Sequence, residues 1–200
     1  MLLNRFEKIM MNNPVRAAFQ SHFEVSRLIA MGGRLQGGRA LEVGCGRGVG
    51  IGLILDAFGA AHVDAFDYDL EMVALAAKRV ETRGTNVRLW QGDAAAIPAP
   101  GALYDAVFDF GIIHHVPDWR RAVNEVFRVL KPGGRFYVEE VLSGFINNPI
   151  CRRLFDHPRQ DRFDYLAFRT GLTLAGFNVI ASNQLLGQVA WYVATKPPSP

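Results

Sequence analysis

The sequence predicts an α/β protein built on an open, doubly wound sheet. From residue 40 onward, short apolar segments typical of strands alternate with segments whose apolar residues recur every three or four positions, as in helices. The short connections between them favour parallel strands joined by right-handed crossovers. After residue 176, two strand-like segments meet at a tight turn, which predicts a terminal hairpin and an antiparallel edge. We therefore expect seven strands, most of them parallel.

Composition narrows the class of protein. Half of the 200 residues are hydrophobic and 20% are charged, as in globular domains. No run approaches the ~18 consecutive apolar residues of a membrane-spanning helix, and charges at Arg5 and Glu7 come too early for a signal peptide. Two distant cysteines, Cys45 and Cys151, do not suggest a disulfide scaffold. We expect a single cytoplasmic domain over residues 1–200, without a membrane span.

Residues 1–39 predict a helical cap at the start of the domain. Asn13 can cap a helix and Pro14 suits its first turn, while Gly32-Gly33 would end it. This segment carries six Lys or Arg residues against two Glu, whereas the remainder is nearly neutral. A nucleic-acid site usually shows a denser basic stripe. We therefore favour an arginine-rich, solvated helix face and expect no nucleic-acid partner.

Residues 40–141 carry the parallel part of the sheet. Apolar segments predict five strands, at residues 40–43, 61–66, 87–90, 105–110 and 135–141. Helical periodicity predicts helices at about residues 49–58, from Asp69 to Gly84, and from Asp118 to the Lys131-Pro132-Gly133-Gly134 breaker. Asp69 and Asp118 are the expected caps, because a carboxylate accepts hydrogen bonds from the free N–H groups of a first helical turn.

The remaining residues add an insert and the hairpin. Residues 142–165 predict an irregular insert, and its residues 142–162 contain apolar residues together with four Arg against two Asp. Residues 166–200 hold most of a helix at about 163–175, followed by strands at 178–186 and 188–195. Gly187 provides the turn between those two strands.

A glycine-rich turn follows the first predicted strand and comprises Gly44-Cys45-Gly46-Arg47-Gly48. Ligands of open α/β sheets bind beyond the carboxyl ends of the strands, and glycines let the backbone approach a ligand closely. The spacing does not match the Gly-x-Gly-x-x-Gly of dinucleotide sites, because Val49 stands where the third glycine is needed. Glu42, two residues before the turn, would repel a pyrophosphate and favours a cationic ligand such as a sulfonium with a free ammonium group.

Two further strand ends carry acids suited to an adenosyl group. Asp67 ends the second predicted strand, where its carboxylate can accept both hydroxyls of a ribose. Gly92-Asp93-Ala94 follows the third strand. There a carboxylate can accept from the exocyclic amine of adenine, and small neighbours admit the ring.

Five motifs follow one another along residues 40–141. They are Leu41-Glu42-Val43-Gly44-Cys45-Gly46-Arg47-Gly48, Ala65-Phe66-Asp67, Gln91-Gly92-Asp93-Ala94, Tyr104-Asp105-Ala106-Val107-Phe108 continuing to His114-His115-Val116-Pro117-Asp118, and Arg128-Val129-Leu130-Lys131-Pro132-Gly133-Gly134. Together they resemble the class I S-adenosylmethionine-dependent methyltransferases, and the terminal hairpin matches the last two strands of that family. The resemblance is to the subgroup that modifies small molecules such as quinones and lipids. It implies a Rossmann-like fold, methyltransferase activity and S-adenosyl-L-methionine as the cofactor.

The resemblance also implies the cofactor contacts. The implied cofactor-binding residues are Glu42, Gly44, Cys45, Gly46, Asp67, Tyr68, Gly92, Asp93, Ala94 and Phe110. Glu42 would reach the methionine amino group, Asp67 the ribose and Asp93 the adenine. Phe110 would offer its backbone carbonyl to the methionine ammonium. Relatives often carry a polar residue at this position, so the Phe110 ring is expected to narrow the part of the site that receives the acceptor.

Methyl transfer from a sulfonium needs alignment and exclusion of water, and needs a general base only for some acceptors. His114, after the fourth strand, is the candidate base because histidine titrates near neutral pH. Alternatively, His114 and His115 pack against or cap the helix that starts at Asp118. Glu139 and Glu140 face opposite sides of a strand and cannot form one acid–base pair. No residue pattern demands a metal.

We therefore expect methyl transfer to a small, hydrophobic acceptor, with the N-terminal helix and residues 142–162 forming a lid over it. Three alternatives stay open. An NAD(P)-dependent oxidoreductase conflicts with the glycine spacing, and a non-catalytic cofactor-binding subunit would share the same pocket residues. An RNA or protein methyltransferase would explain the basic N-terminus. However, Phe108-Asp109-Phe110-Gly111 stands where enzymes acting on base amino groups carry Asn/Asp-Pro-Pro-aromatic.

Overall fold

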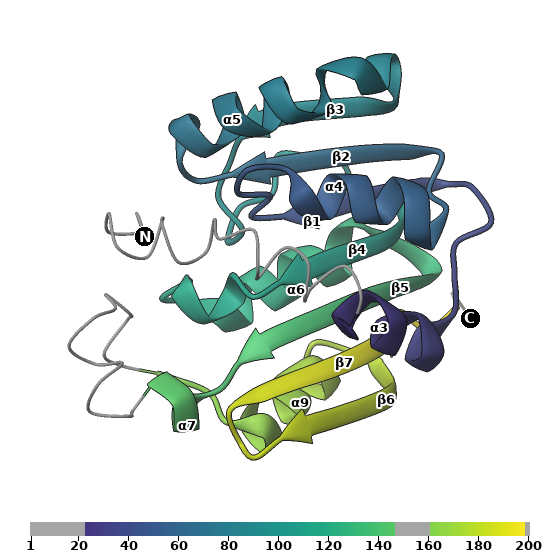
Figure 1. Ribbon diagram of the computed structural model, residues 1–200. Coiled ribbons are helices and arrows are strands. Elements are labelled where there is room, and N and C mark those ends of the chain that lie inside the picture. Colours follow the sequence, from purple (N-terminus) through teal and green to yellow (C-terminus); the bar gives the residue numbers. More distant parts are fainter. Residues whose placement is uncertain (1–22, 147–160, 199–200) are drawn as a thin grey trace.

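A computed structural model describes residues 23–146 and 161–198. These residues form a seven-stranded sheet in the order β3-β2-β1-β4-β5-β7-β6 (Figure 1). The strands are β1 (Arg39–Val43), β2 (His62–Asp67), β3 (Val87–Gln91), β4 (Tyr104–Phe110), β5 (Leu130–Val141), β6 (Asn178–Leu185) and β7 (Val189–Thr195). Strands β1 to β5 pair in parallel, and β7 is antiparallel to both β5 and β6. The predicted Rossmann-like sheet with an antiparallel hairpin is confirmed.

Strand β1 lies at the point where the strand order reverses. Its residue Glu42 pairs with Ala65 of β2 on one side and with Phe108 of β4 on the other. After β1, the chain adds β2 and then β3 on one side of β1, and it then adds β4 on the other side. Ligands of doubly wound sheets bind in the crevice outside the carboxyl ends of strands at such a reversal.

The helices cover both faces of the sheet. They and the shorter helical turns are α3 (Val25–Gly32), α4 (Val49–Leu53), η2 (Ile54–Phe58), α5 (Leu70–Val80), η3 (Glu81–Asn86), η4 (Ile113–His115), α6 (Trp119–Val129), α7 (Ser143–Ile146) and α9 (Tyr165–Leu174). Buried residues of α3, α4 and α5 pack on one face, and those of α6 and α9 pack on the other. Figure 1 shows α3 and α4 in front of the sheet and α9 behind it.

Alternate residues of β4 divide between the two hydrophobic layers. Phe108 faces the α3–α5 side, where its ring lies 4.7 Å from Phe58 and 4.8 Å from Tyr137. Val107 faces the α6–α9 side. Because both faces are covered, most residues of β1, β2 and β4 are buried, which is why short apolar runs predicted these strands.

Two boundaries differ from the sequence prediction by more than two residues. Strand β5 begins at Leu130, before the predicted residue 135, because Leu130 already pairs with Tyr104. The register then shifts, and Arg135 pairs with Ala106. Helix α5 ends at Val80. A 3₁₀ segment continues the chain to the predicted stop at Gly84, whose φ of 62° breaks the helical path.

The predicted helix caps are confirmed. The Asp69 carboxylate accepts a hydrogen bond from Glu71 N at 2.9 Å at the start of α5. The Asp118 carboxylate accepts one from Arg121 N at 3.1 Å at the start of α6. Each cap satisfies one of the backbone donors that a first helical turn leaves free.

Helix α3 is the described part of the predicted N-terminal helix; it ends at Gly32, and Gly33 is its C-cap. The predicted start at Asn13 lies outside the described residues, as does most of the 142–165 insert. The Tyr137 hydroxyl of β5 lies 3.0 Å from the Gly32 carbonyl oxygen and 2.9 Å from that of Gly33. This contact satisfies the carboxyl end of α3 and fixes the helix on the sheet.

Candidate functional site

The turn after β1 has a backbone that only glycine adopts without strain. Gly44, Gly46 and Gly48 have φ angles of 69°, 51° and 77°. A Cβ added to Gly44 would lie 2.6 Å from Ile112 Cγ1, whereas a Cβ on Gly46 would meet nothing within 4 Å. The turn is therefore packed at Gly44 and borders open space at Gly46. This is the arrangement expected of a backbone that approaches a ligand.

Cys45, in the middle of the turn, is a packing residue. Its side chain is buried, and its backbone N–H donates to the Phe66 carbonyl at 2.9 Å. Burial raises the pKa of the Cys45 thiol far above its usual value, with Glu42 and Asp67 adding to the rise. The thiol therefore stays protonated and is a poor nucleophile.

Asp67 joins the glycine turn to the start of α5. Its Oδ2 accepts a hydrogen bond from Gly46 N at 2.9 Å, and its Oδ1 accepts one from Asp69 N at 2.9 Å. Burial raises the pKa of Asp67, while these two N–H donors oppose the rise. Each carboxylate oxygen keeps a second lone pair, so both can still accept a ribose hydroxyl.

The predicted adenine-side residues lie beside Asp67. Gly92 N donates to the Asp67 carbonyl at 3.0 Å, which brings the ends of β2 and β3 together. Tyr68 is 52% exposed and Ala94 is buried. The exposed Asp93 accepts a hydrogen bond from Ala95 N at 2.8 Å. The structure thus gathers these residues at one edge of the sheet.

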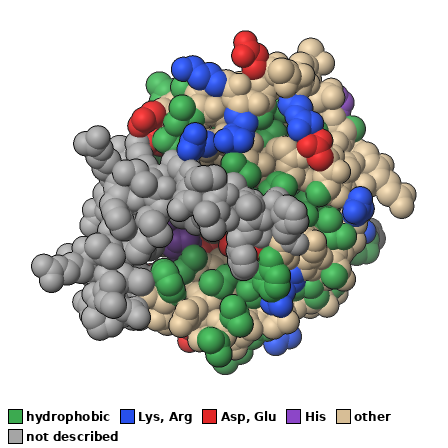
Figure 2. Space-filling view, viewed as in Figure 1, with side chains coloured by type: hydrophobic (Ala, Val, Ile, Leu, Met, Phe, Trp, Pro, Cys, Tyr) green, Lys and Arg blue, Asp and Glu red, His purple; other side chains and the backbone are tan. Residues whose placement is uncertain are grey.

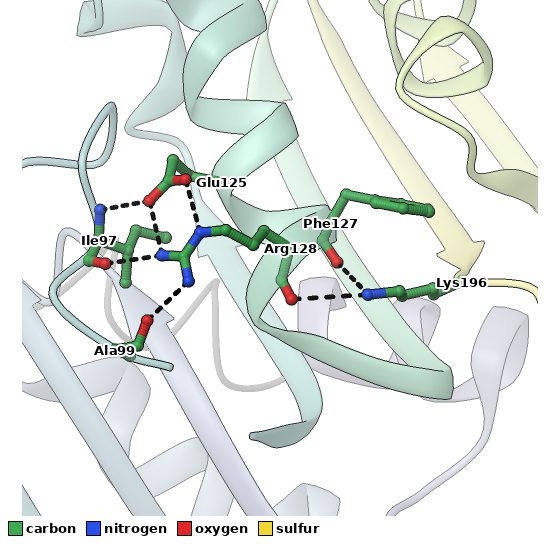
Figure 3. Close-up of polar contacts among 6 residues, drawn as sticks. All are labelled: Ile97, Ala99, Glu125, Phe127, Arg128 and Lys196. Atoms are coloured by element: carbon green, nitrogen blue, oxygen red, sulfur yellow. Dashed lines mark hydrogen bonds and ion pairs between the residues drawn. The ribbon is translucent and has the colours of Figure 1, made fainter. Parts of the chain in front are cut away.

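Helix α6 fixes the loop that continues from Asp93 (Figure 3). Arg128 donates to the carbonyl oxygens of Ile97 at 2.8 Å and Ala99 at 2.7 Å. Glu125 accepts from Ile97 N at 2.8 Å and pairs with Arg128 at 2.7 Å. Lys196, after β7, donates to the Phe127 carbonyl at 2.8 Å at the carboxyl end of the same helix. The adenine-side loop is therefore held by side chains about 30 residues away in sequence.

Glu42 is a buried carboxylate that lacks a hydrogen-bond donor for one oxygen. It is 2% exposed, and its Oε2 has no partner among the described residues. Burial raises its pKa well above the usual range, and the nearby Asp67 and Asp109 carboxylates add to the rise. A buried acid in this state is costly unless a cation or donor joins it.

Gly50 in α4 provides the space for Glu42, a role that the sequence analysis missed. A Cβ on Gly50 would overlap Glu42 Oε1 and lie 2.8 Å from the Phe110 ring. The available signal was the run of glycine at every second position from Gly44 to Gly52. The Phe110 ring itself is buried in the α3–α5 layer and stacks on Phe108 at 5.9 Å.

His114 is buried in η4 and is held by a carboxylate of β5. Its Nδ1 lies 2.6 Å from Glu140 Oε2, and its ring centre lies 4.1 Å from that of His115. The N-cap of α6 is Asp118, while η4, which carries both histidines, lies against α6, as in the packing alternative. Glu139 and Glu140 are both buried on opposite faces of β5, as predicted. Only Glu140 reaches His114.

No three His, Cys, Asp or Glu side chains within residues 23–146 and 161–198 are arranged to hold a metal ion. None of the helices in these ranges combines the length and apolar character that crossing a membrane requires. On the face shown in Figure 2, basic and acidic side chains are interspersed, and a histidine lies beside acidic side chains.

Sequence comparison identifies a family match in the part of the chain that builds this site. Residues 40–134 match the model of a methyltransferase domain family. A probable S-adenosylmethionine-dependent methyltransferase of Mycolicibacterium smegmatis is 40% identical over 120 residues, covering 60% of this chain and 44% of that protein. A demethylmenaquinone methyltransferase of Thermus thermophilus is 36% identical over 103 residues, covering 51% of this chain and 46% of that protein. The chain thus spans about half the length of these curated relatives.

Structure comparison extends over nearly the whole chain. A chain from the complex between the Haloferax volcanii Trm112 methyltransferase activator and a putative methyltransferase superposes with a TM-score of 0.78. The match covers 98% of this chain and 100% of that one, at 17% sequence identity. At that identity the likeness establishes the fold alone.

Proposed function

The chain belongs, through residues 40–134, to the class I S-adenosylmethionine-dependent methyltransferases, and we propose that it transfers a methyl group from this cofactor to a small, hydrophobic acceptor. The observation that carries the proposal is Glu42, a buried carboxylate with an unpartnered oxygen, beside a glycine turn that is open at Gly46. A cationic ligand would supply the charge that this carboxylate lacks.

The residues present fit S-adenosylmethionine. Glu42 suits its ammonium group, the free lone pairs of Asp67 suit the ribose, and Asp93 with Ala94 suits the adenine edge. When bound, the cofactor supplies a methyl group on a positively charged sulfur. The same buried acids disfavour a dinucleotide, since a pyrophosphate would lie against like charge. The NAD(P)-dependent alternative therefore conflicts with the electrostatics as well as with the glycine spacing.

The acceptor is proposed to be small and hydrophobic, and the protein to be cytoplasmic. One relative is named for demethylmenaquinone, a hydrophobic small molecule. The N-terminal helix and residues 142–162 are proposed to cover the acceptor and exclude water. Deleting residues 1–22 tests that role without removing Val25 and Leu28, which are buried in the core.

His114 is proposed as the general base for acceptors that carry a proton. It follows β4, at the edge of the sheet where the cofactor residues gather. Histidine titrates near neutral pH, and its Nδ1 is already engaged by Glu140, which leaves Nε2 as the nitrogen to receive a proton. A base of this kind contributes about 10²–10⁴-fold to the rate.

The proposal is tested by binding and turnover together. Calorimetry should show S-adenosylmethionine binding and no comparable affinity for NADH.

Incubation of the protein and S-adenosylmethionine with hydroxyl, amine and thiol compounds should release S-adenosylhomocysteine. Asp67→Asn should weaken cofactor binding by about 1–3 kcal/mol, because hydrogen bonds to a charged acceptor are lost. Binding of NADH in preference to S-adenosylmethionine would refute the proposal, whereas cofactor binding without any turnover would favour a non-catalytic subunit.

A further inference from the structure

The Glu140 carboxylate is a fixed acceptor for the segment that carries His114. Its Oε1 accepts hydrogen bonds from Ile113 N at 2.6 Å and His114 N at 3.2 Å. Its Oε2 lies 2.6 Å from His114 Nδ1 and accepts from Val141 N at 3.1 Å. The side chain is fully buried at the carboxyl end of β5. Both the backbone and the ring of His114 are therefore oriented by one carboxylate.

A second buried acid, Asp109, stands next to Glu140. It lies on β4 opposite Val138 of β5, and its Oδ1 accepts from Ile112 N at 2.9 Å. Burial and the neighbouring Glu140 raise the pKa of Asp109 well above its usual range. Burial also raises the pKa of Glu140, to about 8, while Asp109 and backbone N–H groups oppose that rise. The proton that the pair keeps longest is therefore on Asp109, and Glu140, which accepts more backbone hydrogen bonds, carries the charge once the pH reaches about 8.

A carboxylate at Nδ1 determines what the other ring nitrogen can do. In a neutral imidazole one nitrogen carries the proton and the other a lone pair. With Nδ1–H donated to Glu140, the lone pair is on Nε2. When Nε2 takes up a proton, the Glu140 charge stabilises the imidazolium that forms. The ion pair then lies in a buried setting, where the attraction is stronger than in water.

We propose that Glu140 is the positioning residue that holds His114 as a base, so that the acceptor methylated at this site bears a proton, as a phenol, hydroquinone or alcohol does. This inference rests on the proposed methyltransferase function. In the transfer step the acceptor oxygen gives its proton to His114 Nε2 and gains the methyl carbon. The electron pair of the broken S–C bond stays on sulfur, and His114 later releases its proton to water.

Other ionisable groups surround this pair on the elements packed against it. Asp109 comes from β4, His115 from η4, and Glu139 from the same strand as Glu140. Burial raises the pKa of Tyr192 in β7, and the charges of Glu140 and of Asp164, the N-cap of α9, add to the rise. Glu139 provides the matched control, because it is a buried glutamate one residue away that faces the other side of β5.

The first measurement is nitrogen NMR of ¹⁵N-histidine-labelled full-length protein. Above pH 8, where Glu140 is charged, the wild type should show His114 with the proton on Nδ1. Glu140→Gln should lower the His114 pKa, weakening its proton affinity by about tenfold or more, while Glu139→Gln leaves it unchanged. A wild-type proton on Nε2, or the same titration in wild type and Glu140→Gln, would overturn the proposal. The wild-type spectrum tests the position of the His114 proton even if the Glu140→Gln variant does not fold.

The second measurement compares two methyl acceptors in the folded variants. With 1,4-naphthohydroquinone, which must lose a proton, Glu140→Gln should reduce kcat by about 10²-fold and flatten its pH profile. With thiophenol, which is already ionised at pH 8, the change should stay within a few-fold. Equal losses on both acceptors would contradict a positioning role. If the wild type bound no S-adenosylmethionine, the proposed function would fail, while the NMR result would still report on Glu140.

Discussion

Two glycines of α4 show how single residues shape the site. Gly50 faces Glu42 and Phe110, whereas Gly52 is in ordinary contact range only of Arg83, at 3.9 Å. Both lie in the same helix, so an added methyl group has similar helix propensity at either position. What differs is the space that each glycine leaves for a neighbour.

Gly50→Ala should therefore destabilise the protein by about 1–3 kcal/mol, because the new methyl group forces Glu42 or the Phe110 ring to move. Displacing Glu42 should also weaken S-adenosylmethionine binding. Gly52→Ala is the control and should be neutral or stabilising by up to about 1 kcal/mol. Denaturant unfolding and calorimetry measure the two effects. Equal behaviour of the two variants would contradict the role given to Gly50.

At the scale of elements, the cofactor edge depends on contacts between segments far apart in sequence. The loop after β3 carries Asp93 and is held by Arg128 of α6, which also pairs with Glu125. The glycine turn is joined to β2 through Asp67. These links place the ends of β1, β2 and β3 relative to each other, and the helices act as supports for the loops.

Arg128→Ala should loosen the loop that follows Asp93. Its hydrogen bonds to the Ile97 and Ala99 carbonyls would be lost, and the amide protons of residues 92–99 should exchange faster with solvent. Cofactor affinity should fall severalfold through the adenine side. Arg121→Ala, an exposed position on the same helix, is the control. Unchanged exchange in Arg128→Ala would show that the clamp does not order the loop.

At the scale of the whole molecule, the site concentrates buried acids at one edge of the sheet. Burial raises the pKa values of Glu42, Asp109 and Glu140 above those of exposed carboxyl groups. The folded state therefore binds these protons more tightly than the unfolded chain does. The resulting stability is complete below the unfolded values near ~4 and is lost as the pH rises through the raised values.

The melting temperature of the ligand-free protein should thus fall between pH 6 and pH 9. Acids with lowered pKa values, such as the exposed Asp56 and the half-buried Asp105, titrate below this window and do not oppose the fall. Glu42→Gln should make the melting temperature fall less steeply with pH, whereas Glu81→Gln, at an exposed position, should not change this dependence. S-adenosylmethionine should also reduce it, because its ammonium compensates the Glu42 charge. A melting temperature that rises across this range would contradict the assignment.

The sequence by itself determined what depends on neighbours along the chain. The alternation of strand and helix, the caps at Asp69 and Asp118 and the glycine turn are local patterns, since each follows from hydrophobic periodicity or from backbone freedom within a few residues. Family motifs added the expected roles of Glu42, Asp67 and Asp93. These site roles stay predictions for the experiments above.

Only the tertiary structure decided which distant residues meet. Strand β7 lies between β5 and β6, so the hairpin places its second strand inside the sheet. Glu140 reaches His114 across 26 residues, and Gly50 leaves room for Glu42. Such contacts depend on strand order and on how side chains fill the space between layers. No local periodicity encodes them, because the packing of the whole domain fixes both the pairing and the available volume.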